Sequence, residues 1–156
     1  MARGGNVNIE ELDAFIQKVE SNLTGANLEQ FIESCAKELA ARLLAKVIKR
    51  TPVGRYPKGS GKLGGTLRRG WTAGKNQSAN GYVNSLNVEK TGDVYRIEIV
   101  NPVEYAPYVE FGHRTRNHKG WVEGKFMLTI SEKEIENDAP RVLENKLKKK
   151  LGELMK

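Results

Sequence analysis

The stretch LEQFIESCAKELAARLLAKVIKR, residues 28–50, predicts a long amphipathic helix. Its apolar side chains recur at helical spacing and form one stripe: Leu28, Ile32, Cys35, Leu39, Leu43 and Val47. We expect the helix to end near Arg50, because Pro52 disfavours helical backbone at Thr51. An apolar stripe needs a partner surface, and we expect this helix to cover a β-sheet.

A shorter helix is expected before it. Asn8 and Glu11 have the spacing of a capping box, and apolar residues then continue at helical spacing up to Gly25, a plausible stop. Residues 1–7 are expected to be a flexible N-terminal tail. The chain of 156 residues suits one domain, so the sequence predicts a single domain over residues 8–156.

Residues 73–81, AGKNQSANG, continue a glycine-rich region and are expected to be a loop. Two segments after it, residues 82–89 and 93–100, predict an antiparallel hairpin. Strand alternation points three side chains of the second segment one way: Tyr95, Ile97 and Ile99.

The C-terminal third predicts short turns, a loop and a helix. Residues 104–112, EYAPYVEFG, suit one or two helical turns, and residues 112–125 form a second basic loop. The final helix is expected to restart near Asp138 and Pro140. The fold class is therefore α+β, with terminal helices packed on a small, mainly antiparallel sheet, and with long basic loops.

The positive charge is regional. The net charge is +7, yet no acid occurs between Leu39 and Val88. Such a surface favours an anionic partner without identifying it. One cysteine excludes an internal disulfide, no segment is long and apolar enough for a membrane span, and the start lacks a signal-peptide core, so we expect a cytosolic product.

Catalytic and cofactor sites find little support. Residues 51–71, TPVGRYPKGSGKLGGTLRRGW, lack the glycine spacing and the hydroxyl of a P-loop. His113 and His118 lie in a basic loop without an acid or cysteine between them, which disfavours a metal. Cys35 belongs to an apolar helix stripe, where cysteine acts as a small hydrophobe. We therefore expect no enzyme activity and no cofactor.

Nucleic-acid binding has more support in the sequence than catalysis. Lys and Arg attract phosphates, and aromatic residues in the basic segments can stack on bases: Tyr56, Trp71 and Trp121. We find no helix-turn-helix pattern, RNP-type motif or zinc knuckle. A glycine-rich basic arm would serve equally well to dock on an acidic protein surface, so composition leaves both interpretations open.

Three segments carry a resemblance to a known family. Residues 51–71 resemble a "(S/T)PV-x-TG-x-LR-x-(S/G)" signature, and residues 105–116, YAPYVEFGHRTR, resemble "YA-x-(Y/F)-(V/I)-E-(F/Y)-G-T". Residues 122–130, VEGKFMLTI, resemble the "PFL/PFM" entry to a last helix. Together they are similar to the tail-component family of long-tailed phages and prophages typified by the gene-ten product of phage HK-ninety-seven. The resemblance covers about residues 28–155.

The chain departs from these signatures at three places. His113 stands where Thr is usual, Lys125 stands where Pro is usual, and the loop between Val53 and Leu67 is lengthened. The fold expectation is unaffected, because all three departures lie in loops.

The resemblance implies a structural virion protein that joins heads to tails or completes the tail. It implies a homo-oligomeric ring, a hexamer being one option, with other phage neck and tail proteins as partners and non-specific DNA contact in the channel. The expected location is the virion tail or neck, after assembly in the host cytoplasm, with no membrane contact. The runner-up is a basic DNA-binding accessory protein; a nuclease would need acids near the basic patch.

Assembly residues are expected in the two basic segments and the turn between them. Leu67 is expected to pin the arm to the core, with Arg68 and Arg69 pointing outward, and Trp71 is favoured as a packing or interface anchor. Glu110 is expected either to pair with an arginine or to be solvent-exposed. The candidate interface residues are Arg55, Lys58, Lys62, Leu67, Arg68, Arg69, Trp71, Tyr105, Tyr108, Glu110, Phe111, Arg114, Arg116 and Trp121.

Overall fold

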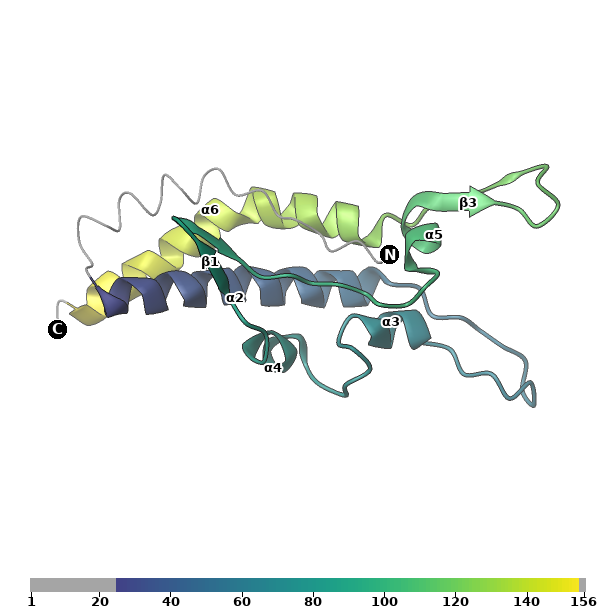
Figure 1. Ribbon diagram of the computed structural model, residues 1–156, viewed down its shortest axis with the longest axis horizontal. Coiled ribbons are helices and arrows are strands. Elements are labelled where there is room, and N and C mark those ends of the chain that lie inside the picture. The colour runs from purple at the N-terminus through teal and green to yellow at the C-terminus, as the bar shows by residue number, and fades with distance from the viewer. Residues whose placement is uncertain (1–24, 155–156) are drawn as a thin grey trace.

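The computed structural model describes residues 25–154, and two long helices dominate it (Figure 1). They are α2 (Ala26–Arg50) and α6 (Met127–Leu154), which pack on each other. Lys146 Nζ donates to Glu38 at 2.9 Å, and Lys46 Nζ donates to Glu134 at 3.0 Å. The helices are antiparallel, because the later residue of α2 pairs with the earlier residue of α6.

Short elements lie between the two long helices in the chain. The helices are α3 (Thr66–Gly70), α4 (Ala79–Asn84) and α5 (Ala106–Phe111). The strands are β1 (Glu89–Thr91), β2 (Val94–Arg96), β3 (Gly112–Arg114) and β4 (Trp121–Glu123). This content confirms the α+β class.

The strands form two separate antiparallel hairpins, rather than the single sheet that the sequence predicts. In β1–β2 Glu89 pairs with Arg96 and Thr91 with Val94. α4 and β2 lie against α2, and so does α6. The long helices therefore bury their apolar faces mainly against each other, because three-residue strands offer too little surface to cover them.

The predicted stripe of α2 is confirmed. Its members are buried, apart from Leu28, which is partly buried. Phe31, Ala40 and Leu44 are buried as well, because α2 has neighbours on more than one side. Burial raises the pKa of the Cys35 thiol to about 12, which agrees with its expected role as a small hydrophobe.

The end of α2 and the strand alternation are also confirmed. α2 ends at Arg50, and Thr51 adopts extended backbone before Pro52. In the segment after Gly92, Tyr95 and Ile97 are partly buried and Ile99 is buried, while the residues between them are exposed. The segment 97–101 continues this burial pattern beyond β2 without ladder partners.

Three local predictions are wrong. Residues 79–84 form α4, capped by Ser78 Oγ, which accepts from Gly81 N at 3.1 Å, rather than a loop and a strand. The loop 112–125 contains the β3–β4 hairpin. α6 runs through Pro140 without a restart. Ile135, Ala139 and Leu143 are buried on both sides of this proline, so packing outweighs its local cost. The helix predicted before Gly25 and the tail 1–7 lie outside the described residues.

Candidate functional site

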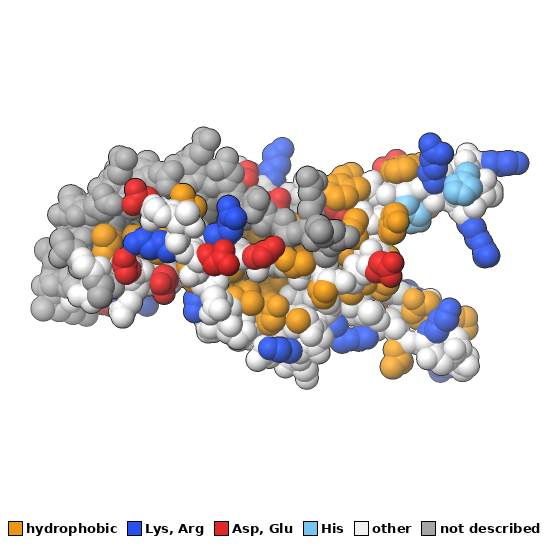
Figure 2. Space-filling view, in the orientation of Figure 1, with side chains coloured by type: hydrophobic (Ala, Val, Ile, Leu, Met, Phe, Trp, Pro, Cys, Tyr) orange, Lys and Arg blue, Asp and Glu red, His pale blue; other side chains and the backbone are white. Residues whose placement is uncertain are grey.

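Two projections extend from the end of the molecule where α2 stops and α6 begins (Figure 1). One is the arm, residues 52–63, in which every residue is exposed. The other is the β3–β4 hairpin. In Figure 2 blue side chains mark both projections, and a notch separates them. The arm contains Arg55, Lys58 and Lys62 and no acid, so its charge is wholly positive.

Thr51 holds the base of the arm. Its Oγ1 donates to the Val47 carbonyl at 2.7 Å and accepts from Trp71 Nε1 at 2.7 Å, and its side chain is fully buried. Its carbonyl accepts from Arg68 Nε at 3.2 Å and Arg68 Nη2 at 2.7 Å. Leu67 lies in the core beside them. These four residues, Thr51, Leu67, Arg68 and Trp71, are called the arm base below.

The arm base confirms the packing role of Leu67 and corrects the expectation for Arg68. The Arg68 guanidinium points back to the end of α2, where it satisfies a carbonyl that the helix leaves free. Arg69 is exposed and donates to the Gly64 carbonyl at 3.2 Å. Trp71 is only 2% exposed, so it is a packing anchor and offers no stacking face for a base.

The two sides of the arm come together at glycines. A Cβ placed on Gly64 would collide with the Gly54 carbonyl oxygen, so the chain closes this tightly only with glycine there. Beyond that contact, Ser60 N donates to the Pro57 carbonyl at 3.2 Å, and Lys62 Nζ lies 5.8 Å from the Tyr56 ring centre. The arm is thus a closed loop with a turn at its far end.

Glu110 takes neither of its expected roles. It belongs to α5 and is 6% exposed, and its side chain lies against the first turn of α6. Its carboxylate accepts from Leu128 N and Thr129 N, both at 2.9 Å, and from Thr129 Oγ1 at 2.7 Å. It therefore caps the N-terminus of α6, where backbone N–H groups lack helical partners. A capping residue so distant in sequence gives no local signal.

Aromatic side chains are exposed around α5 and the β3–β4 hairpin. Three of the candidate interface residues, Tyr105, Tyr108 and Phe111, are exposed there. α5 buries Ala106 and Glu110 instead. Trp121, which faces Arg114 across the β3–β4 ladder, is 57% exposed. Exposed aromatic residues grouped in this way are typical of interaction surfaces.

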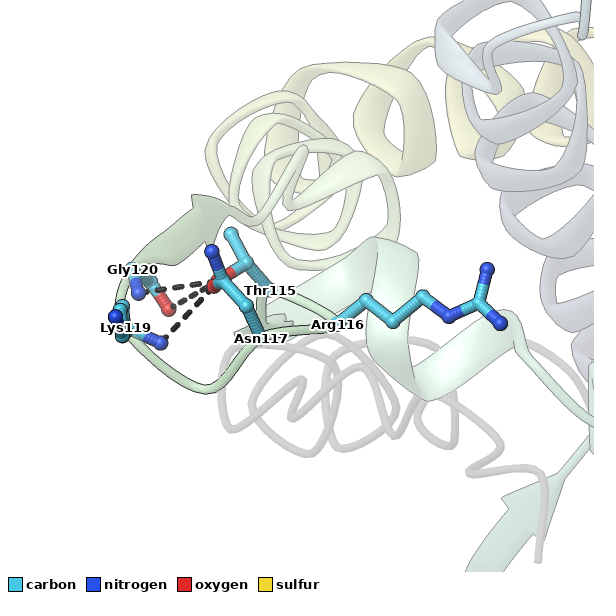
Figure 3. Close-up of a pocket in the computed structure, with 5 residues that line it drawn as sticks. All are labelled: Thr115, Arg116, Asn117, Lys119 and Gly120. Atoms are coloured by element: carbon cyan, nitrogen blue, oxygen red, sulfur yellow. Dashed lines mark hydrogen bonds between the residues drawn. The ribbon is translucent and has the colours of Figure 1, made fainter.

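Hydrogen bonds order the tip of the β3–β4 hairpin. Thr115 Oγ1 donates to Asn117 Oδ1 at 2.7 Å and accepts from Gly120 N at 3.0 Å, and Lys119 N donates to Asn117 Oδ1 at 3.1 Å. Figure 3 shows Arg116 pointing away from this cluster, which borders a shallow open hollow. The tip therefore presents cationic side chains on an ordered backbone.

The arm, the arm base, α5 and the β3–β4 hairpin together bring most candidate residues to one end of the molecule (Figure 1). Among residues 25–154, no group of three His, Cys, Asp or Glu side chains is arranged to hold a metal ion. None of the helices in that range has the length and apolar character that a bilayer crossing requires.

A comparison with family models identifies a matching family. The family described as "Bacteriophage HK97-gp10, putative tail-component" matches residues 13–112. This range includes the arm, the arm base and α5, and it ends at the first residue of β3. No curated protein and no solved structure matches the chain.

Proposed function

This chain belongs to the HK97-gp10 family of phage tail components, and from that premise we propose that it is a structural subunit at the head–tail junction. Its subunits assemble as a ring that completes the tail and joins it to the head. The chain resides in the virion tail or neck, after assembly in the host cytoplasm, and it performs no catalysis. Its partners are copies of itself and other phage neck and tail proteins.

The observation that supports this function is the shape of the molecule. A helical core carries two exposed projections at one end, and buried or partly buried family-signature residues anchor them: Thr51, Leu67, Arg68 and Glu110. Such a design holds docking segments at fixed positions on a rigid body. Subunits in a ring meet through heterologous surfaces, which a chain with a distinct projecting end provides.

The test is an in-frame deletion of the gene in an inducible phage or prophage that encodes the chain. We expect electron microscopy to show DNA-filled heads and separate tails, with joining restored by the wild-type gene in trans. A point variant of an exposed residue far from both projections, Lys148→Ala, serves as the control and should complement fully. Normal virions from the deletion strain would contradict the proposed function.

The basic tips also support a second candidate, a DNA-binding accessory protein. Arg55, Lys58, Arg116 and Lys119 are exposed and accessible to phosphates. A shift assay with duplex DNA separates the candidates: submicromolar affinity that falls steeply with salt would favour DNA binding. Weak binding without sequence preference would fit subunits that merely surround DNA in a channel.

A further inference from the structure

We propose that the arm and the β3–β4 hairpin dock on the outer face of the β1–β2 hairpin of a second copy of this chain. The inference rests on the ring assembly proposed above and names the surfaces that would meet in it. Cations at the projecting end of one subunit would face carboxylates on its neighbour.

The projecting end has free cations. Arg55, Lys58, Arg116 and Lys119 are exposed, and none of them forms an ion pair with another residue between 25 and 154. By contrast, two cations at the end of α2, Arg50 and Lys46, both form ion pairs with Glu134. The charges at the projections are therefore available to a partner.

Carboxylates lie along the β1–β2 hairpin: Glu89 is in β1, Asp93 is in the turn, and Glu98 follows β2. Glu89, Asp93 and Glu98 are exposed, and none of them forms an ion pair with a residue of the described range. Val94, between them, is an exposed apolar residue. Arg96 is the cation of this face, whereas Lys90 is directed to Glu29 at 2.7 Å. We call Glu89, Asp93, Val94 and Glu98 the acidic face.

The two surfaces lie apart on one molecule. Figure 1 places β1 beside the middle of the long helices, away from the projecting end, and Figure 2 shows acidic side chains on the face in view. A contact between unlike surfaces on two copies is heterologous and propagates from subunit to subunit. Such contacts form a closed ring when the rotation between neighbouring subunits brings the last subunit into contact with the first.

Apolar exposure favours a protein partner over DNA. Leu63 on the arm is 84% exposed, and Trp121 and Val122 are exposed on the β3–β4 hairpin. These side chains cannot bury apolar surface against a charged phosphate backbone. They can bury it against an exposed apolar residue of a protein partner, such as Val94. The charges would then guide encounter and orientation, and apolar burial would supply affinity.

The test is a charge swap in the full-length chain, followed by sedimentation velocity. We expect the hairpin-tip variant Arg116→Glu/Lys119→Glu to weaken self-association by about tenfold or more, and the acidic-face variant Asp93→Lys/Glu98→Lys to do the same. Combining the four substitutions should restore self-association to within about threefold of the wild type, because each charge again meets its opposite. The control Lys148→Glu/Lys149→Glu makes the same charge change on exposed α6 positions and should have little effect.

Several results would overturn the inference. These are a tip variant that associates like the wild type, a combined variant no better than the single-surface variants, or a wild-type chain that stays monomeric at high concentration. A tip variant that loses only duplex-DNA binding would point to nucleic acid instead. Virions that assemble normally with the tip variant, but not with the gene deletion, would leave the proposed function standing and remove this interface.

Discussion

The first turn of α6 leaves backbone N–H groups without partners inside the helix, and Glu110 accepts from those of Leu128 and Thr129. Phe126, just before the helix, has no side-chain acceptor that could do this. The capping carboxylate therefore comes from α5, and it ties the end of that helix to the start of α6. This link makes Glu110 a structural residue rather than a contact for a partner.

Glu110→Ala is expected to destabilise the subunit by about 2–3 kcal/mol, because it leaves buried N–H groups without an acceptor. Glu110→Gln keeps one acceptor oxygen and should lose less. Urea unfolding followed by circular dichroism measures both. The exposed Glu104→Ala is the control, with an expected change within about 0.5 kcal/mol. Equal stability of Glu110→Ala and the control would contradict the capping role.

Glu132 differs from Glu110, because one of its carboxylate oxygens lacks a hydrogen-bond donor in the described part of the chain. That oxygen, Oε1, is buried, and burial, with Glu110 and Glu136 nearby, raises the pKa of Glu132 to about 7. Between the ordinary glutamate pKa of 4.5 and about 7, the folded carboxyl holds a proton that the unfolded one releases. This residue therefore makes stability fall as pH rises through that window.

Glu132→Gln is expected to stabilise the subunit at pH 8 by about 1–2 kcal/mol, after allowance for partial solvent screening. The gain should vanish below the pKa of the unfolded carboxyl, where both proteins carry a neutral side chain. Thermal unfolding at several pH values measures this. A gain that is the same at all pH values would show that the charge of Glu132 is not its cause.

At the scale of elements, the arm base decides how the arm leaves the core. The Thr51 hydroxyl accepts from the Trp71 indole and donates its own proton to the end of α2. Thr51→Val keeps the shape but removes the acceptor, so the buried Trp71 N–H loses its partner. We expect a loss of about 1–3 kcal/mol, measured by urea unfolding. Thr51→Ser retains the hydroxyl and should lose clearly less; an equal loss would implicate the methyl group instead.

The arm is the expected first site of proteolysis. Residues 52–63 are exposed, whereas α3, directly after the arm, buries Leu67 and Gly70. Limited trypsin digestion should cut after Arg55, Lys58 or Lys62 before it cuts α2 or α6, because an extended exposed loop fits a protease best. Mass spectrometry of early fragments identifies the sites. First cuts inside either long helix would contradict this expectation.

At the scale of the whole molecule, the arm can be separated from the fold. Its two sides meet at Gly54 and Gly64, so residues 55–63 can be replaced by a short Ser-Gly turn. We expect this variant to keep the unfolding temperature within about 2 °C but to fail to complement the gene deletion. Wild-type complementation by the shortened chain would remove the arm from the assembly surface.

Charge reversal at Arg68 and Arg69 would test the arm less cleanly than this shortening does. Arg68 binds the Thr51 carbonyl, so reversing its charge would weaken the arm base itself. A failure of assembly would then have two explanations. Substitutions at Arg55 and Lys58 avoid this ambiguity, because both residues lie in the exposed arm, outside the arm base.

The sequence by itself determined the features that depend on near neighbours. The stripe of α2 follows from helical spacing, and the stop at Arg50 follows from Pro52. The short turns of α5 and the alternation from Tyr95 to Ile99 are local in the same sense. The sequence also indicated the family, because the family signatures are contiguous stretches that include Thr51 and Glu110.

Only the tertiary structure decided the partners of residues that act across the chain. Glu110 finds its N–H groups on α6, and Arg68 finds its carbonyl at the end of α2. Pro140 stays inside α6 because packing against α2 compensates its local cost. These outcomes depend on which segments meet in space, and pairing over long sequence distances is set by the burial of the whole core rather than by any local pattern.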